Sequence, residues 1–304
     1  MKHLIVIAGP TASGKTSIGV AIAKHFNTCV VSADSRQFYK EVSIGTAKPD
    51  LEEQQGVTHH FINSHQLEDE VTAAQYEKEG LVILEEEFKD KDVVVLVGGS
   101  GMFVDALCIG LDDIPTDPEM KRQIQTELDA NGLSPLLSEL AEKDPEYYEQ
   151  VDRQNASRVM RAVEVIRITG KKYSDLRQGS KKERPFKVHS FVLDHEREVL
   201  YNRINLRVDL MMEAGLEAEA KSVLHLRHLT SMNTVGYKEL FAYFDGTMDK
   251  ETAINQIKQN SRRYAKRQLT WLRRHPESHW IKFTDSETVI KEILSIFEEK
   301  RSIG

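Results

Sequence analysis

Cysteines and long apolar runs are both scarce in this chain of 304 residues. The only cysteines are Cys29 and Cys108; each lies in an apolar context, and neither is near another cysteine at the spacing of a metal site. This usage predicts buried free thiols rather than a disulfide, as is typical of a protein in the reducing cytoplasm. No apolar run approaches the ~18 residues that a membrane-spanning helix needs, so we expect no membrane partner.

Several familiar functional patterns are also missing. The eleven histidines show no H-E-x-x-H or comparable spacing, and His59-His60 is an isolated pair, so we assign no metal site to them. No internal repeat or low-complexity tract is present, so neither a solenoid nor a disordered tail is indicated. The formal net charge of −7, taken alone, argues against a nucleic-acid partner.

A phosphate-binding loop stands near the start of the chain. Residues Gly9 to Thr16 read Gly-Pro-Thr-Ala-Ser-Gly-Lys-Thr, a complete match to G-x-x-x-x-G-K-[ST]. The apolar run Leu4 to Ala8 predicts a strand before it, and residues 17–26 predict a helix after it. In this context we expect backbone N–H groups to hold phosphate, with Lys15 on the terminal phosphate oxygens and Thr16 on a bound Mg²⁺.

Strand and helix patterns alternate through the first hundred residues and predict an α/β fold with a P-loop NTPase-like, doubly wound parallel sheet. The strands are expected at 4–8, 28–33 and 92–97, with a weak candidate at 58–62. From about 112 to 184 only helical patterns occur, and a strand pattern returns at 187–193, followed by helices at 196–214, 216–227, 236–244, 249–274 and 286–299. We therefore predict a catalytic core of residues 1–111 and 187–304, interrupted by an all-helical insertion domain at 112–186.

Asp34 follows the second predicted strand, at the edge of the sheet where the phosphate loop also lies. A carboxylate there can bind Mg²⁺ through water or accept a proton from a nucleophile. The alternative interpretation is that Asp34 caps the N-terminus of a helix. The position of Asp34 at this edge favours the functional interpretation. Ser100 lies in the loop after strand 92–97. This loop could contact an anion or a base, or it could be only a tight turn, and the sequence favours neither interpretation. That strand lacks a terminal Asp of the Walker B kind, which weakens an ordinary NTPase interpretation.

Lys and Arg gather in two stretches, 153–184 and 262–274, despite the negative total. Arg263 and Arg267 are neighbours at helical spacing, and such like charges destabilise a helix unless an anion bridges them. A solvated basic face is the alternative. Two separate basic surfaces predict contact with an extended polyanion.

Seven sequence strings spread along the whole chain match one known family. They are the phosphate loop, Asp34-Ser35, Ile44-Gly45-Thr46-Ala47-Lys48-Pro49, Val97-Gly98-Gly99, Arg161-Ala162-Val163-Glu164-Val165, Val235-Gly236-Tyr237 and Tyr264-Ala265-Lys266-Arg267-Gln268-Leu269-Thr270-Trp271. On these strings the chain resembles the tRNA dimethylallyltransferase family. The resemblance implies transfer of a dimethylallyl group from its diphosphate to the exocyclic amine of the adenosine just 3′ of the tRNA anticodon, with release of diphosphate. The implied partners are dimethylallyl diphosphate and the tRNA anticodon stem-loop, the implied cofactor is Mg²⁺, and no obligate protein partner is expected.

The same resemblance implies a role for each matching residue. Asp34 would accept the proton of the adenine amine, while Lys15 and Mg²⁺ on Thr16 would stabilise the leaving diphosphate. The implied diphosphate-binding residues are Gly9, Pro10, Thr11, Ala12, Ser13, Gly14, Lys15 and Thr16. The implied tRNA-binding residues are Asp34, Ser35, Arg36, Gln37, Ser100, Lys121, Gln154, Asn155, Arg158, Arg161, Arg263 and Arg267. The chain departs from the usual family pattern at Ser100, Met102, Phe103, Lys121, Asn233 and Thr234, which bears on single contacts and not on the reaction.

Three other interpretations stay open on the residues alone. An adenylate isopentenyltransferase would use a free nucleotide and would need no basic insertion. A P-loop small-molecule kinase would share the loop and the sheet. An RNA-binding module without chemistry would not need Asp34.

The basic stretch at 262–274 generates the first prediction. Replacing Arg263 and Arg267 together by Ala should weaken tRNA binding most at low salt and flatten its dependence on salt, because two phosphate contacts are lost. Affinity measured across a salt series tests this expectation. An unchanged affinity at every salt concentration would show that residues 262–274 do not contribute to tRNA binding.

Overall fold

The computed structural model describes residues 1–179 and 181–303. They divide into two compact units, and each is described here by itself. Unit 1 consists of Met1–Cys108 and the chain from Arg184 onward, and unit 2 consists of Ile109–Glu183. The boundaries lie near the expected 112 and 186. Arg184 and Phe186 belong to unit 1, since Phe186 already starts a strand of the sheet.

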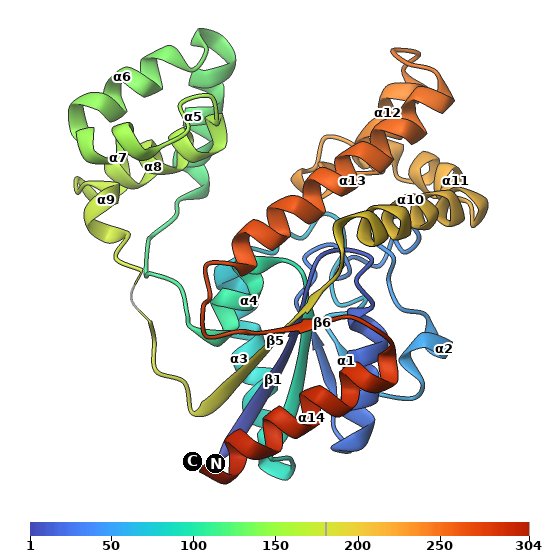
Figure 1. Ribbon diagram of the computed structural model, residues 1–304. Coiled ribbons are helices and arrows are strands. Elements are labelled where there is room, and N and C mark those ends of the chain that lie inside the picture. The colour runs from blue at the N-terminus through green and yellow to red at the C-terminus, as the bar shows by residue number, and fades with distance from the viewer. Residues whose placement is uncertain (180, 304) are drawn as a thin grey trace. The chain divides into compact units, whose positions relative to one another are not determined.

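A six-stranded sheet forms the centre of unit 1 (Figure 1). Every pair of neighbouring strands is parallel, and the strand order is β3-β2-β4-β1-β5-β6. The strands are β1 (Lys2–Ala8), β2 (Val30–Ser32), β3 (His59–His60), β4 (Val93–Gly98), β5 (Phe186–Asp194) and β6 (His279–Lys282). Strands β1 and β4 are almost fully buried, as expected of parallel strands covered on both faces. The predicted parallel α/β fold is confirmed.

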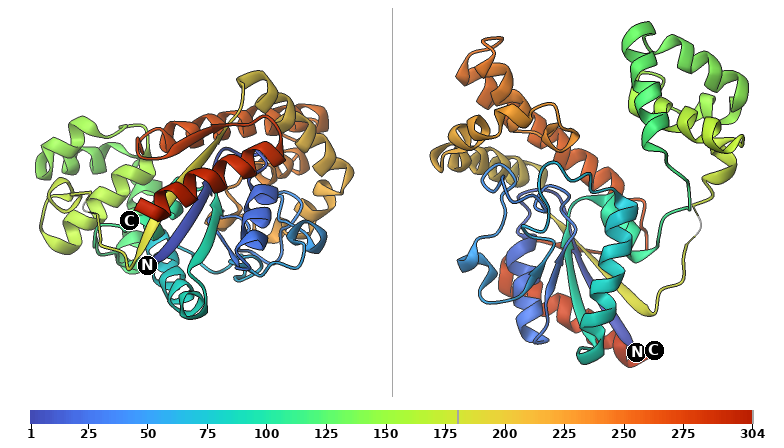
Figure 2. Two further views of the ribbon diagram at one scale, coloured as in Figure 1. Left: turned by 60° about the horizontal axis from the view of Figure 1, so that its bottom comes forward. Right: turned by 180° about the vertical axis from the view of Figure 1, so that it is seen from behind.

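Helices cover both faces of the sheet (Figure 2). Helices α1 (Lys15–His25) and α14 (Ser286–Ile303) pack together on one face, and α3 (Ala73–Asp90) and α4 (Gly101–Cys108) pack together on the other. Side chains alternate along a strand, so Ile5 and Ile7 of β1 enter one core with Ile18 of α1 and Val289 of α14. Because β2, β4 and β1 are parallel neighbours, their carboxyl ends lie at one edge of the sheet.

Beyond that edge lie four helices that form a second core of unit 1. They are α10 (Arg197–Glu213), α11 (Leu216–Ser222), α12 (Tyr237–Phe244) and α13 (Lys250–Leu272). Val208, Leu216, Tyr237 and Ile257 are buried together there. Short elements complete the unit: α2 (Leu51–Gln54), η1 (Leu224–Leu226) and η2 (Thr230–Met232).

Unit 2 is built from helices around a core of its own. They are α5 (Pro118–Asn131), α6 (Ser134–Lys143), α7 (Pro145–Gln150), α8 (Ala156–Thr169) and α9 (Tyr173–Leu176). Ile124, Leu140 and Val163 are fully buried in this core. The side chain of Asp144 caps α7 by accepting a bond from Tyr147 N, and it also accepts bonds from the N–H and the hydroxyl of Ser174 in α9. Its described residues include no strand.

Two expectations about unit 1 differ from the structure. Strand β6 was not predicted; it is only four residues long and pairs with β5 alone at the edge of the sheet. The single helix expected at 216–227 is wrong, because α11 ends at Ser222 and η1 follows as a separate turn. None of the helices in residues 1–179 and 181–303 combines the length and the apolar character that crossing a bilayer requires.

A buried histidine pair gives the fold a stability that depends on pH. His3 of β1 and His189 of β5 share a hydrogen bond of 3.0 Å, and both rings pack edge-on against Phe297. Burial lowers the pKa of His189 to about 4 and also lowers the pKa of His3. Since an unfolded histidine has a pKa of about 6.5, the unfolded chain binds protons more tightly below that pH.

We therefore expect the free energy of unfolding to fall as the pH drops from about 6.5 toward 4. The share of His189 is about 2 kcal/mol between pH 7 and pH 5. Urea unfolding at both pH values measures the loss, which should be smaller in His189→Gln. The exposed His25, replaced in the same way, is the control. An equal acid loss in the wild type and in His189→Gln would contradict the assignment.

Candidate active site

The phosphate loop joins β1 to α1 and turns sharply at two positions. Ala12 and Gly14 both have left-handed backbone angles, with φ of 63° and 88°. Gly14 is the N-cap residue of α1, where a side chain would strain the backbone. The first N–H groups of a helix have no partner within it, so the start of α1 offers donors to an anion.

Side chains bind the carbonyl oxygens of this loop. Lys15 donates from Nζ to the oxygen of Pro10 at 2.7 Å, and Arg203 donates from Nε to the oxygen of Ala12 at 2.7 Å. His195 donates from Nε2 to the oxygen of Ser13 at 2.8 Å. These bonds occupy the carbonyl oxygens of Pro10, Ala12 and Ser13, so the side of the loop that faces the site is dominated by N–H groups and cations.

Positive charge dominates around the loop. Lys15 and Arg207 are both half-buried here, and burial lowers the pKa of each, that of Lys15 to about 8. The nearby carboxylate of Asp34 opposes the shift on both groups, whereas each cation is disfavoured by another: Lys15 by Arg207, and Arg207 by Arg203. Three cations, Lys15, Arg203 and Arg207, line the space at the loop with two carboxylates, Asp34 and Glu53. Cations removed from water need a counter-charge, so a bound anion would balance the excess positive charge.

Two pockets meet at Asp34. The first, which we call the phosphate pocket, is a cavity of about 560 Å³ lined by the loop residues 11–17 and by α10. The second, which we call the acceptor pocket, is a cavity of about 440 Å³ that opens between the 45–47 segment, α10, α12 and α13. Four residues line both: Thr11, Asp34, Thr46 and Arg207. A group in one pocket can therefore react with a group in the other beside the Asp34 carboxylate.

Local hydrogen bonds hold Asp34 at this junction. Its Oδ1 accepts a bond from Arg36 N at 3.1 Å, and its own N–H donates to Ser32 Oγ at 3.3 Å. Residues 35–38 form turns and no helix begins there, so the structure excludes the N-cap reading of Asp34. Gln37 donates to the oxygen of Ala47 at 3.1 Å and so ties this turn to the segment on the other wall.

The Ser100 loop lies against the same turn. Ser35 N donates to Ser100 Oγ at 3.1 Å, and Ser100 Oγ donates to Ser35 Oγ at 3.2 Å. Tyr264 of α13 lines the acceptor pocket beside them, and its pKa is raised by burial and by the nearby Asp34. Of the two readings of Ser100, the structure shows a hydroxyl that positions the turn carrying Ser35.

One glutamine links three parts of the site. Gln268 of α13 accepts a bond from Thr11 N and donates to the oxygen of Gly99, both at 2.8 Å. Gly99 must lack a side chain, because a Cβ there would lie 2.3 Å from Gln268 Nε2. This amide fixes the phosphate loop, the loop after β4 and α13 relative to one another.

Glu219 organises the 43–47 segment. Its carboxylate accepts three backbone N–H bonds, from Ser43, Ile44 and Gly45, at 2.8 to 2.9 Å. The hydroxyl of Tyr237 donates a fourth bond at 2.6 Å. The segment lines both pockets, so one side chain from α11 sets the shape of the wall that they share.

Thr16 lies where a magnesium ligand is expected. Its side chain lines the phosphate pocket with Asp34 and Glu53. Hydroxyl and carboxylate oxygens are the ligands that Mg²⁺ prefers, so these residues fit the ion.

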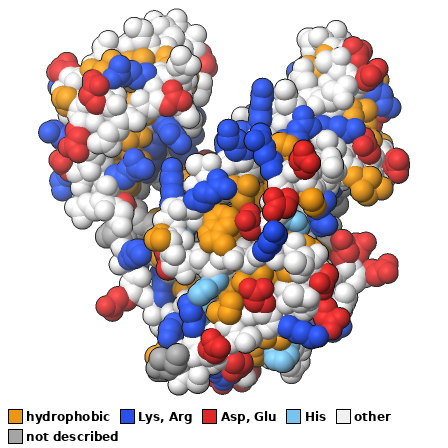
Figure 3. Space-filling model, viewed as in Figure 1, with side chains coloured by type: hydrophobic (Ala, Val, Ile, Leu, Met, Phe, Trp, Pro, Cys, Tyr) orange, Lys and Arg blue, Asp and Glu red, His pale blue; other side chains and the backbone are white. Residues whose placement is uncertain are grey.

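The implied tRNA contacts in unit 1 lie around the acceptor pocket. Asp34, Ser35, Arg36 and Arg267 line it, and Arg36 donates to the oxygen of Ser231 at 3.0 Å. Gln37 lines the phosphate pocket instead. The exposed cations of the region lie along α13 and just after it, at Arg263, Lys266, Arg267, Arg273 and Arg274. Figure 3 shows Lys and Arg side chains gathered over α13.

In unit 2 the implied contacts lie on α5 and at the start of α8. Lys121 is on α5, Gln154 and Asn155 precede α8, and Arg158 is in its first turn. Asn155 caps α8 by accepting a bond from Arg158 N at 3.2 Å. Arg161 is committed to the fold: it donates to Glu164 Oε2 at 2.7 Å and to the oxygen of Ile114 at 3.1 Å.

The basic surface expected over 153–184 is therefore smaller than its sequence indicates. Arg167 is bound by the carboxylates of Glu127 and Glu139, which raise its pKa. Arg184 is buried in unit 1 against Glu77. Carboxylates of the protein neutralise the charges of Arg167 and Arg184, so neither arginine adds to a basic outer surface.

Several site residues were missed by sequence reasoning. They come from α10, α11 and α13 or from just before α10: His195, Arg203, Arg207, Glu219 and Gln268. The sequence contained one signal for these residues. Arg203 and Arg207 are four residues apart, which places both on one face of a helix. Their contact with the phosphate loop depends on packing across almost 200 residues of chain.

Known proteins are similar to this chain along nearly its whole length. The family described as IPP transferase matches residues 37–275. A tRNA dimethylallyltransferase of Cytophaga hutchinsonii is 47% identical over 300 residues, which cover 98% of this chain and 97% of that protein. Among solved structures, a tRNA isopentenylpyrophosphate transferase of Bacillus halodurans is 35% identical, with a TM-score of 0.73 and coverage of 100% of this chain and 99% of that one. A eukaryotic dimethylallyltransferase described as acting on tRNA is 26% identical, with a TM-score of 0.78 and coverage of 94% and 75%.

The bonds of Glu219 generate a prediction for the shared wall. Glu219→Gln keeps the size of the side chain but turns one acceptor into a donor that faces backbone N–H groups. We expect a loss of about 1.5–3 kcal/mol in the free energy of unfolding, with faster hydrogen exchange at residues 43–47 and lower activity. Tyr237→Phe removes a single donor and should have a smaller effect. Unchanged exchange at 43–47 in Glu219→Gln would show that this carboxylate does not hold the segment.

Proposed function

This chain belongs to the IPP transferase family, and we propose that it transfers a dimethylallyl group from dimethylallyl diphosphate to tRNA. The acceptor is the exocyclic amine of the adenosine just 3′ of the anticodon. The observation that carries the proposal is the meeting of the phosphate and acceptor pockets at Asp34. Relatives named for this activity, aligned over almost the whole chain, support it.

In the proposed step, the adenine nitrogen attacks the first carbon of the dimethylallyl group. The C–N bond forms as the C–O bond to the diphosphate breaks, and the bonding electrons leave with the diphosphate. The nitrogen loses one proton to the Asp34 carboxylate. A positioned general base contributes about 10²- to 10⁴-fold to such a step.

The phosphate pocket stabilises the charge that develops on the leaving group. Lys15, Arg203, Arg207 and the start of α1 face the anion before the reaction begins, so little reorganisation is required. Mg²⁺ bound by Thr16 would add further positive charge to the diphosphate when present. The carbonyl oxygens of Pro10, Ala12 and Ser13 are bonded to side chains and do not oppose the anion.

The acceptor pocket is suited to a single flipped base. Its walls include the apolar side chains of Ile204, Val208 and Ile257, and Asp34 and Tyr264 supply polar groups. A nucleotide within a loop must leave its stack to enter such a pocket. The exposed arginines of α13, with Arg158 and Lys121 of unit 2, are the proposed contacts to the anticodon stem-loop in the cytoplasm.

A direct assay tests the activity against the alternatives. The protein is incubated with dimethylallyl diphosphate and Mg²⁺, together with unmodified tRNA or with free AMP, and the nucleosides are then analysed by mass spectrometry. Prenylated adenosine from tRNA alone is expected. Product from AMP alone would identify a free-nucleotide enzyme, and phosphoryl transfer from ATP to a small acceptor without prenylation would identify a kinase.

Asp34 provides the sharpest test of the chemistry. Asp34→Ala should keep tRNA affinity but lose most turnover, by about 10²-fold or more, because the base acts in the chemical step. Asp34→Asn keeps the size and the turn but not the base, so it should lose as much. Binding and single-turnover rates separate the two effects. Wild-type turnover in either variant would refute the role of Asp34.

A further inference from the structure

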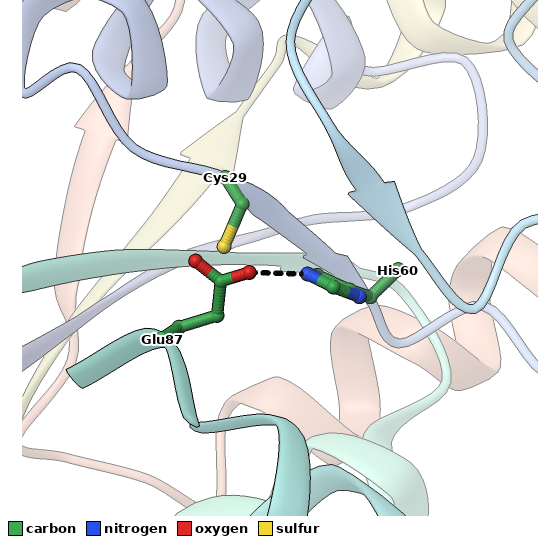
Figure 4. A group of neighbouring side chains, drawn as sticks. All are labelled: Cys29, His60 and Glu87. Carbon is green, nitrogen blue, oxygen red and sulfur yellow. Dashed lines mark hydrogen bonds and ion pairs between the residues drawn. The ribbon is translucent and has the colours of Figure 1, made fainter. Parts of the chain in front are cut away.

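Three side chains that the proposed reaction does not use converge at the opposite edge of the sheet (Figure 4). Cys29 directly precedes β2, His60 ends β3, and Glu87 lies in the last turn of α3. Their ligand atoms all lie within 4.8 Å of one another, and within the described residues no other His, Cys, Asp and Glu group of this kind occurs. Cys29 lies at the amino end of its strand, away from the phosphate loop.

The fold brings these residues together although they are far apart in the chain. Strands β2 and β3 pair with Val31 opposite His60. Cys29 is two residues before Val31, and alternation places both on the same face of the sheet. His60 Nε2 and Glu87 Oε1 are 2.8 Å apart. Figure 4 shows the thiol, the imidazole and the carboxylate pointing toward one another.

We propose that Cys29, His60 and Glu87 form a binding site for Zn²⁺. Thiolate, imidazole and carboxylate are the three kinds of ligand that zinc takes from proteins. A thiolate in the set disfavours Mg²⁺ and Ca²⁺, which prefer oxygen alone. Binding forms a Zn–S bond and releases the thiol proton to solvent. Three protein ligands leave the fourth tetrahedral position to water.

The cluster is buried on one side and open to solvent on the other, which would let an ion enter and then hold it. Cys29 is only 1% exposed, so the sulfur lies inside the protein. The side chains of His60 and Glu87 are 26% and 15% exposed, so the cluster is reachable from solvent on their side. Since the ligands come from the residue before β2, from β3 and from α3, a bound ion would join this edge of the sheet to α3.

Lys91 is the group that works against a cation here. Its ammonium binds Glu87 Oε2, while Oε1 faces His60. A carboxylate can bind a metal through one oxygen and keep an outer partner on the other. The lysine charge still lowers the affinity for a second cation close by. Removing the charge of Lys91 should therefore strengthen Zn²⁺ binding if the ion sits at Glu87. If the three side chains form only a hydrogen-bond network, removing that charge should leave the affinity for Zn²⁺ unchanged.

The test uses the full chain and Zn²⁺ alone, measured by calorimetry and by the shift in melting temperature. We expect one equivalent to bind. Affinity should fall by more than about 100-fold in Cys29→Ser and in His60→Ala, because each removes a direct ligand and the loss of an outer-shell partner alone costs about 10- to 100-fold. Cys108→Ser is the matched control, since Cys108 is also buried but lies on α4. Lys91→Met should tighten binding by about tenfold.

Co²⁺ provides a spectroscopic readout that does not depend on activity. The loaded wild type and Cys108→Ser should show a thiolate-to-cobalt charge-transfer band, and Cys29→Ser should not. Circular dichroism establishes that each variant is folded, and His60→Ala tests the site if Cys29→Ser does not fold. Absence of binding in the wild type, or binding that survives both Cys29→Ser and His60→Ala, would overturn the proposal.

Discussion

The site depends on the hydrogen bonds that occupy three carbonyl oxygens of the phosphate loop. Arg203, His195 and Lys15 each bind one of these oxygens. With these three acceptors occupied, the loop presents its remaining N–H groups and positive charge to the space in front of α1. The rest of unit 1 serves this arrangement: the parallel sheet brings Asp34 to the same edge, and the packing of α10 against α13 places the arginines.

The parts of the fold that follow from local pattern were predictable. Strand β4 is a nearly unbroken apolar run because both of its faces are covered, and the phosphate loop sits between a strand and a helix as its motif requires. Strand β6 was not predictable in the same way. Its four residues carry little periodic signal, and they become a strand because β5 offers an open edge.

The same division holds for the site. Asp34 could be predicted because the carboxyl edge of a parallel sheet is a general location for ligands. Glu219 and Gln268 could not, because their partners are backbone groups more than 150 residues earlier in the chain. Charge counting was also insufficient. Arg167 looks basic in the sequence, yet two glutamates from neighbouring helices bind it. The family resemblance read from the motifs is confirmed by the match to the IPP transferase family.

The ends of unit 2 have an evolutionary consequence. Lys182 N donates to the oxygen of Ile109 at 2.8 Å, so the outgoing and returning chains are bonded to each other at the root of the unit. Unit 2 also has a hydrophobic core of its own. A segment whose ends meet can be lengthened, shortened or exchanged by recombination without changing the register of the strands on either side. Selection can therefore remodel the helices of unit 2 while the chemistry at the sheet edge is inherited intact.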